Sequence, residues 1–201
     1  MKLKNKNGLI FCDVDSVILN FDKSFRLFVN KKLNKNFTKK QFCNRKYYYL
    51  YENKEFNISY KQDRELFTEW CENNGFKNLE LFKNGEYINK LYNFFKIILI
   101  THIPDKYIKD RLYNLKNYGI KYNDFIATYE KDKYINNYIN KNKFENIFFI
   151  EDNYKNFGNT NLNIISPVII NAGYNIDFNC NLKFNSLKEF YDYLKDNFII
   201  Y

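Results

Sequence analysis

One stretch near the start of the chain, residues 8–18, constrains the fold most. It is an apolar run that leads into two carboxylates, Asp13 and Asp15, before apolar character resumes. Such a run is typical of a buried strand, and an open α/β sheet binds its ligands at the carboxyl ends of its strands. Two carboxylates at the end of a buried strand are costly unless a cation or protons compensate their charge. The stretch therefore predicts a strand followed by a divalent-metal site, at which one aspartate attacks a substrate.

Further apolar runs alternate with helical patterns along most of the chain. Strands are expected over residues 96–101, 124–128, 147–152 and 167–170. Helices are expected over residues 104–119 and 133–142, and from Ser186 onwards. This alternation predicts a parallel, doubly wound α/β sheet with right-handed crossovers.

The segment between the first two expected strands has a different character. Helical patterns cover about residues 62–73 and 85–95, and no run typical of a strand interrupts them. We therefore predict an α/β core domain of residues 1–20 and 96–201, with a mainly helical cap, residues 21–95, inserted after the first strand.

Polar side chains gather at the expected carboxyl ends of the strands and at the start of one helix. They are Asp13, Asp15, Thr101, Lys131, Lys133, Glu151 and Asp152. A parallel sheet places these strand ends on one edge. Oxygen ligands hold Mg²⁺, a carboxylate can form an aspartyl-phosphate, and donors with a positive charge balance the oxygens of a phosphoryl group. The set therefore favours phosphoryl transfer.

Four of these segments, in this order, resemble the motifs of the haloacid dehalogenase superfamily of phosphatases. They are Asp13-Val14-Asp15-Ser16-Val17, Thr101 after Ile-Ile-Leu-Ile, Lys133 or failing that Lys131, and Glu151-Asp152 after Ile-Phe-Phe-Ile. Within the superfamily, the first segment, continued as Ile-Leu-Asn-Phe, is most similar to the nucleotidase branch, which includes the deoxyribonucleotidases. The resemblance runs from about Gly8 to Asn171, and the insertion is its least matched part.

The resemblance implies separate roles for the acidic residues. Asp13 would be the nucleophile, and Asp15 would protonate the leaving group and later activate water. Mg²⁺ would lie between Asp13, the backbone carbonyl of Asp15, and Asp152. Glu151 would be a further ligand or a partner of one, because the fourth motif is Glu-Asp here rather than Asp-Asp.

The resemblance also implies that Thr101 and Lys133 hold the transferring phosphoryl group. Two lysines, Lys131 and Lys133, compete for that role. Ser16 stands where many members of the superfamily have glycine, which should alter contacts near the phosphate without removing a catalytic group. The inserted segment would close over the substrate and select it.

The formal net charge of +9 invites a nucleic-acid interpretation. Because the chain is dominated by Lys, Asn, Ile, Tyr and Phe, which A+T-rich codons favour, we attribute most of this basicity to composition. A positive surface still suits an anionic substrate such as a phosphate ester. The four cysteines form no Cys-x-x-Cys pair, so reduced thiols in a cytoplasmic protein are expected, with no signal peptide and no membrane span.

We therefore predict a Mg²⁺-dependent phosphomonoesterase acting on a nucleoside monophosphate or a similar small phosphate ester. The alternatives are a polynucleotide end phosphatase and a non-catalytic domain that binds a phosphorylated ligand or a partner protein. His102, the only histidine, is interpreted as structural or solvated, with a substrate contact as the alternative. The tyrosine-rich run at residues 47–51 is interpreted as packing, with stacking on a nucleobase as the alternative.

Overall fold

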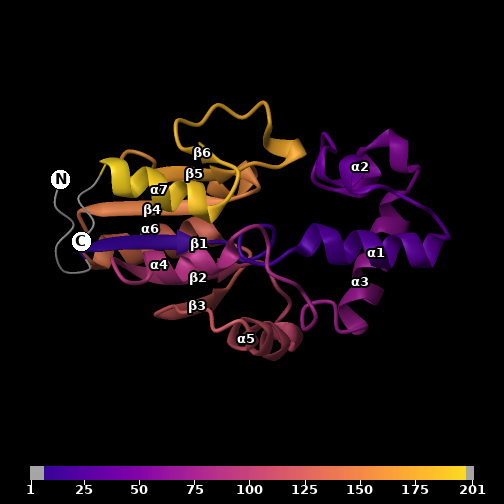
Figure 1. Ribbon diagram of the computed structural model, residues 1–201, viewed down its shortest axis with the longest axis horizontal. Helices are drawn as coiled ribbons and strands as arrows, with labels where there is room; N and C mark the ends of the chain where they lie inside the picture. The colour runs from indigo at the N-terminus through magenta and orange to yellow at the C-terminus, as the bar shows by residue number, and fades with distance from the viewer. Residues whose placement is uncertain (1–6, 198–201) are drawn as a thin grey trace.

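The computed structural model describes residues 7–197 and contains one six-stranded sheet, in which all neighbouring strands are parallel (Figure 1). The strand order is β3-β2-β1-β4-β5-β6. The strands are β1 (Gly8–Cys12), β2 (Phe95–Thr101), β3 (Asp124–Ala127), β4 (Asn146–Glu151), β5 (Ile165–Ile170) and β6 (Lys183–Phe184). The doubly wound parallel sheet predicted from the sequence is confirmed.

Seven α-helices are present among the described residues. They are α1 (Phe21–Leu33), α2 (Lys39–Cys43), α3 (Tyr60–Glu72), α4 (Ile88–Leu91), α5 (Ile108–Asn117), α6 (Lys131–Lys141) and α7 (Leu187–Asn197). Short 3-10 helices are η1 (Leu50–Glu52), η2 (Lys54–Phe56), η3 (Gly85–Tyr87), η4 (Asp105–Tyr107), η5 (Tyr154–Phe157) and η6 (Gly173–Asn175). Within residues 7–197 no helix has both the length and the apolar character needed to cross a membrane.

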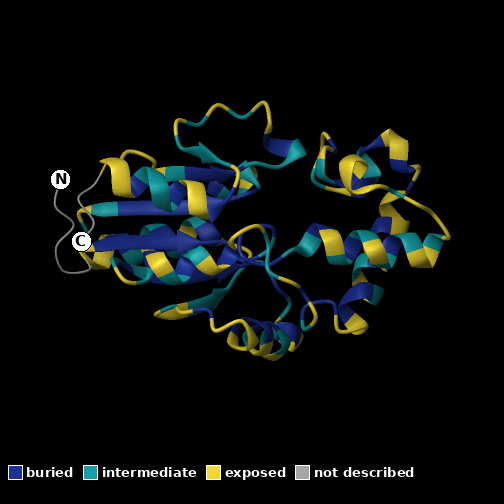
Figure 2. Ribbon diagram, in the orientation of Figure 1, coloured by how far each residue is buried: buried dark blue, intermediate teal, exposed yellow. Residues whose placement is uncertain are grey.

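The four central strands, β2, β1, β4 and β5, are largely buried (Figure 2), and their side chains alternate between two hydrophobic clusters on opposite faces of the sheet. In β1, Leu9 and Phe11 face the cluster that contains Ile135 of α6. Ile10 and Cys12 face the opposite cluster, to which α4 and α7 contribute. Helices on both faces hold the central strands rigidly, so the strand ends give a fixed base for a site.

Three elements differ from the sequence expectation. The helix expected at residue 133 begins at Lys131, because the apolar periodicity of α6 first shows at Tyr134 and gives no signal for a charged residue in the first turn. The helix expected over residues 85–95 is shorter: η3 leads directly into α4, which ends at Leu91, and β2 begins at Phe95. β6 has only two residues at the sheet edge, too short for a strand pattern.

The helices α1, α2 and α3, with η1 and η2, form a helical layer set apart from the sheet (Figure 1). Its interior is aromatic: the Trp70 ring of α3 lies 5.0 Å from Phe21 and 5.9 Å from Phe25 of α1, and 4.9 Å from Phe76. Such ring pairs add to the burial of large apolar surfaces. This aromatic packing fills the interior of the layer and belongs to the same hydrophobic cluster as one face of the sheet.

The chain leaves and re-enters the α/β core at one crossing. Asn20 N–H donates to the Glu80 carbonyl at 2.8 Å, and Phe82 N–H donates to the Ile18 carbonyl at 2.8 Å. After this crossing, η3 and α4 pack against α7 of the core. We therefore propose that the boundaries of the helical layer lie near Asn20 and Glu80 rather than near Lys96, and we call residues 21–79 the cap.

Candidate active site and metal centre

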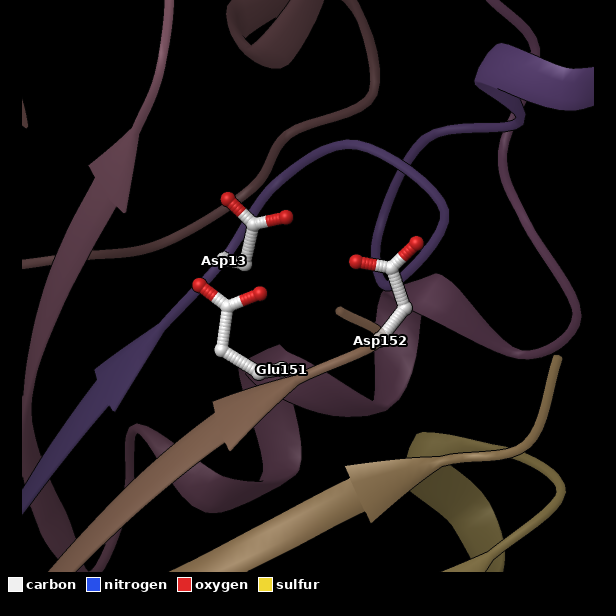
Figure 3. A group of neighbouring side chains, drawn as sticks. All are labelled: Asp13, Glu151 and Asp152. Carbon is white, nitrogen blue, oxygen red and sulfur yellow. The ribbon is translucent and has the colours of Figure 1, made fainter. Parts of the chain in front are cut away.

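Three carboxylates meet at the carboxyl edge of the sheet (Figure 3). Asp13 follows β1 directly, and its N–H donates to the Ile150 carbonyl of β4 at 2.9 Å. Because β1 and β4 are neighbours, this pairing brings Asp13 beside Glu151 and Asp152. One oxygen from each of the three side chains lies within 4.8 Å of the others, and all three residues are buried. The structure therefore brings together the acids that the sequence placed on separate strands.

A buried lysine joins two of these carboxylates. Lys131 Nζ donates to Asp13 Oδ1 at 2.7 Å and to Glu151 Oε1 at 2.5 Å, and only 2% of its side chain is exposed. Burial by itself would lower the pKa of Lys131, but the charges of Asp13 and Glu151 outweigh it and hold the pKa above its ordinary value. The lysine therefore stays charged against the carboxylate of Asp13.

The sequence-based preference for Lys133 does not fit this geometry. The Lys133 side chain is 69% exposed and pairs with Glu130 on the surface. Both lysines are in the first turn of α6, and successive residues of a helix point about 100° apart, so only one of them can face the sheet edge. We correct the expectation in favour of Lys131.

Glu151 and Asp152 have different surroundings. Both Glu151 oxygens accept hydrogen bonds, from Lys131 and from Asn156 Nδ2 at 3.1 Å. Asp152 Oδ2 accepts a hydrogen bond from the Tyr174 hydroxyl. Within residues 7–197, no hydrogen-bond donor contacts Asp13 Oδ2 or Asp152 Oδ1. These two oxygens are therefore the ones available to a cation, while Glu151 holds Lys131 in place.

The charge of the cluster favours a divalent cation. Burial and the charge of Asp13 raise the pKa of Glu151 well above its ordinary value and raise the pKa of Asp152 to about 8. Within residues 7–197, Lys131 pairs with Asp13 and Glu151, Arg111 pairs with Asp15, and Asp152 has no ion pair, so four carboxylates share two cations. A hard divalent cation bound by carboxylate oxygens would offset the excess charge, so the donor set fits Mg²⁺.

Asp15 lies on the cap side of this cluster and has its own cationic partner. Arg111 Nη2 on α5 donates to Asp15 Oδ1 at 2.5 Å, and the arginine is fully buried, with its guanidinium 5.0 Å from the Phe76 ring. Burial raises the pKa of Asp15, Arg111 opposes this shift, and the charge of Asp13 adds to it. The net upward shift favours the protonated form of Asp15, which is the form that a general acid needs.

Arg111 was missed from the sequence. Its partner is 96 residues away, so no local pattern marks it. One signal was available: the chain has only four arginines among 32 basic residues, and two of them, Arg45 and Arg111, are almost fully buried beside the site. In a lysine-rich chain, a buried arginine indicates a position that needs a planar, permanently charged group.

Thr101 and His102 follow the neighbouring strand β2. Thr101 is completely buried, and its hydroxyl has no hydrogen-bond partner within the described residues. A buried hydroxyl without a partner carries an energetic cost, so this hydroxyl is a candidate donor to a bound ligand. The His102 ring lies 5.5 Å from that of Tyr129, and burial lowers the pKa of His102 to about 4, so the imidazole is neutral near pH 7.

Ser16, in the loop between the two aspartates and the cap, has a left-handed backbone with φ of 60°. Its N–H donates to the Leu19 carbonyl at 2.7 Å, which closes the loop. A residue with a Cβ is strained in this region, whereas glycine is not. This conformation gives a physical reason for the glycine that many haloacid dehalogenase proteins have at the matching position.

The Ser16→Gly variant is expected to be more stable than the wild type by about 0.5–1 kcal/mol, because relief of the strained φ exceeds the entropy that glycine adds to the unfolded chain. Urea denaturation measures the change. Ser166→Gly, in strand β5, is the control and should lower stability, since its backbone is extended. A Ser16→Gly variant no more stable than the wild type would contradict this account.

A cavity of about 270 Å³ opens between the cap and the core beside Asp15. Aromatic rings form much of its wall, with Phe25, Phe42 and Tyr48 from the cap and Tyr129 from the core. Tyr48 and Tyr49, in the tyrosine-rich run, both line it, and so does His102. The cavity therefore offers space for an aromatic or apolar group next to the second aspartate.

The structure resembles several proteins of known structure. It is similar to SP0104, a haloacid dehalogenase-like hydrolase from Streptococcus pneumoniae (TM-score 0.65, 14% identity, 92% of this chain and 97% of that chain). It is also similar to the HAD-hydrolase YfnB from Bacillus subtilis, bound to magnesium (0.60, 15%, 96% and 100%). A third similar protein, from Lactobacillus plantarum, is described as a phosphoglycolate phosphatase (0.58, 11%, 92% and 97%). No protein-family model and no curated protein matched. The fold is therefore that of the haloacid dehalogenase hydrolases.

Proposed function

We propose that this protein is a Mg²⁺-dependent phosphomonoesterase that works through an aspartyl-phosphate on Asp13. The observation that carries the proposal is the setting of Asp13. One of its oxygens is held by Lys131, the other is free beside Asp152, and Asp15 lies two residues further on. A non-catalytic binder would have no need of a second aspartate placed to move a proton.

In the proposed reaction Asp13 Oδ1, the oxygen that Lys131 contacts, attacks the phosphorus while Oδ2 is left for the metal, and the bond from phosphorus to the leaving oxygen breaks. Asp15 gives its proton to that oxygen. Asp15 then takes a proton from a water molecule, whose oxygen attacks the phosphorus and releases phosphate and Asp13. Lys131 and the Thr101 hydroxyl would contact the phosphoryl oxygens.

Bound Mg²⁺ would neutralise charge on the phosphoryl oxygens. Asp13 Oδ2 and Asp152 Oδ1 would hold it, and the Asp15 carbonyl remains a proposed ligand from the family resemblance. Glu151 would act through Lys131 rather than on the metal, because both of its oxygens already accept hydrogen bonds. The magnesium-bound relative YfnB supports this choice of metal.

We further propose that the substrate is a small phosphate ester, with a nucleoside monophosphate as our specific candidate. The cavity beside Asp15 supports this class, since its aromatic wall could stack on a planar leaving group. The relative described as a phosphoglycolate phosphatase supports a small substrate in general. Purified protein is therefore expected to hydrolyse an aryl phosphate, and a panel of mononucleotides, sugar phosphates and phosphorylated oligonucleotides would rank the substrates.

The salt dependence of hydrolysis distinguishes a polynucleotide end phosphatase from a phosphatase of small esters. The rate of removing a terminal phosphate from an oligonucleotide should fall steeply between about 50 and 200 mM salt. The rate of mononucleotide hydrolysis should fall only mildly over the same range. Preference for the oligonucleotide with a steep salt dependence would replace the small-substrate proposal.

Mg²⁺ is expected both to activate hydrolysis and to stabilise the folded protein. Chelation should stop hydrolysis, and Mg²⁺ at about 100 times its dissociation constant should raise the free energy of unfolding by about 2.7 kcal/mol. Activity assays and thermal unfolding with and without Mg²⁺ measure both effects. The Asp152→Asn variant should lose most of the thermal shift, and an undiminished shift in that variant would remove Asp152 from the metal site.

A further inference from the structure

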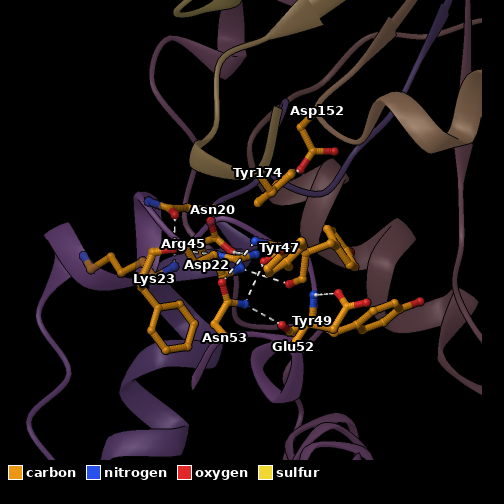
Figure 4. A network of polar contacts seen from close by, with 12 residues as sticks. Asn20, Asp22, Lys23, Arg45, Tyr47, Tyr49, Glu52, Asn53, Asp152 and Tyr174 are labelled. Atoms are coloured by element: carbon orange, nitrogen blue, oxygen red, sulfur yellow. Dashed lines mark hydrogen bonds and ion pairs between the residues drawn. The ribbon is translucent and has the colours of Figure 1, made fainter. Parts of the chain in front are cut away.

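A tyrosine from the loop after β5 contacts the proposed metal ligand Asp152. The Tyr174 hydroxyl donates to Asp152 Oδ2, and both side chains are buried (Figure 4). This hydrogen bond fixes the direction of the carboxylate and leaves Oδ1 as its free oxygen. Groups that orient a ligand in this way commonly change metal affinity tenfold to a hundredfold when they are removed.

The loop that carries Tyr174 is itself tied to the end of β4. Asn175 Nδ2 donates to the Asp152 carbonyl at 2.6 Å and to the Ile170 carbonyl at 2.8 Å. Lys183 Nζ in turn donates to the Asn175 carbonyl at 2.8 Å. These contacts fix the backbone beside Tyr174 on the core. They leave the position of the Tyr174 ring to be set by other contacts.

The cap holds that ring. The Arg45 guanidinium lies 4.7 Å from the centre of the Tyr174 ring, and the Tyr48 ring lies 5.2 Å from it at 82°. Arg45 is fixed in turn by the Phe42 carbonyl at 2.7 Å, the Tyr48 carbonyl at 2.9 Å and Asp22 at 3.0 Å (Figure 4). The ring is therefore packed between groups that belong to the cap, while its hydroxyl contacts the core.

The backbone next to Tyr174 also touches the cap. A Cβ added to Gly173 would lie 2.5 Å from Asn44 Cα and 2.6 Å from the Cys43 carbonyl oxygen. Both are backbone atoms, so they cannot move aside as a flexible side chain would. The absence of a side chain at Gly173 is what allows the segment Cys43–Tyr48 to dock against this loop.

We infer that Tyr174 is a positioning residue for Asp152, and that docking of the cap segment Cys43–Tyr48 on Tyr174 strengthens Mg²⁺ binding. This inference rests on the proposed function for its metal site, and it deepens it by linking the cap to that site. Thermodynamic linkage makes this coupling reciprocal: docking of the cap strengthens Mg²⁺ binding by the same factor by which bound Mg²⁺ favours the docked cap. The cap therefore acts on the metal as well as lining the substrate cavity.

Isothermal titration calorimetry with Mg²⁺ tests the inference without using activity. Tyr174→Phe keeps the ring against Arg45 and removes only the hydroxyl, and it is expected to weaken Mg²⁺ binding about tenfold to a hundredfold. In assays, the Mg²⁺ concentration for half-maximal activity should rise by the same factor, while kcat at saturating Mg²⁺ changes much less.

Gly173→Ala tests the cap directly, because it alters neither Asp152 nor Tyr174. It should displace Cys43 and Asn44 and weaken Mg²⁺ binding in the same direction as Tyr174→Phe. Gly119→Ala is the matched control: its φ of 61° makes an added Cβ costly, yet nothing lies within 4 Å of it. It should lower the melting temperature and leave Mg²⁺ binding unchanged.

Tyr138→Phe, on α6 and packed against Phe11, controls for the loss of a tyrosine hydroxyl and should leave Mg²⁺ binding unchanged. Mg²⁺ affinity equal to that of the wild type in Tyr174→Phe would overturn the role of Tyr174. Unchanged affinity in Gly173→Ala would overturn the role of the cap. A wild type that binds Mg²⁺ but hydrolyses no phosphate ester would overturn the proposed function, while weakened binding in both variants would still support this inference.

Discussion

Replacing Asp13 by asparagine is expected to lower phosphate release by about 10⁴-fold or more and to leave the fold intact. The loss is large because an amide is a poor nucleophile. Asp15, Lys131 and Thr101 would assist the attack by Asp13, so they contribute little once that attack is lost. Stability should not fall, because the variant removes one negative charge from a buried cluster that has more carboxylates than cations. Steady-state kinetics and thermal unfolding measure the two effects.

Asp124→Asn is the matched control for this variant. Asp124 also stands at an end of a strand, the start of β3, but it is exposed, and within the described residues its carboxylate accepts just its neighbour's N–H. Its variant should keep wild-type turnover within about twofold, as surface changes away from a site usually have small effects. An Asp13→Asn protein with full phosphatase activity would contradict the aspartyl-phosphate mechanism.

The second large effect is expected from Lys131→Met, which should both stop catalysis and destabilise the fold. The lysine is buried between Asp13 and Glu151, so its removal leaves two neighbouring carboxylates without their cation. Breaking a buried ion pair by removing one partner typically costs about 3–5 kcal/mol. Turnover should fall at least about a hundredfold, because the variant also loses a positive charge at the phosphoryl group. Urea denaturation and kinetics give the two numbers.

Lys133→Met offers a control two residues away in the same helix turn. Its side chain is exposed and pairs with the exposed Glu130, and exposed ion pairs contribute about 0–1 kcal/mol. Stability should therefore change by less than about 1 kcal/mol and turnover by less than about twofold. If Lys133→Met were the variant that lost activity, the assignment of Lys131 to the site would be wrong.

The strand pattern was predictable because it is local. Apolar runs ending in Asp13, Thr101 and Glu151 mark strands whose ends must share one edge, since parallel strands with right-handed crossovers leave no other arrangement. The main cofactor proposal followed from the same residues: buried carboxylates require a cation, and oxygen ligands suit Mg²⁺. Local signals were also enough to place a helical segment after the first strand.

The remaining parts of the site depend on contacts between distant residues. Lys131 and Asp13 are 118 residues apart, and Arg111 and Asp15 are 96 apart, so periodicity and motif spacing carry no information about either pair. The direction in which Lys131 points follows from how α6 is rotated against the sheet, and that rotation is set by Ile135 and Ile139 in the core. The sequence left Lys131 and Lys133 as competitors for this reason.

The sequence by itself therefore determined the sheet, the edge at which the candidate site lies, and the acids that meet there. Only the tertiary structure decided which lysine faces Asp13, that Arg111 holds Asp15, and that Glu151 holds Lys131 while Asp152 keeps a free oxygen. It also decided that the cap reaches Asp152 through Tyr174. The physical reason is that burial and hydrogen bonding select among chemically equivalent side chains, and both are properties of the packed chain rather than of its local pattern.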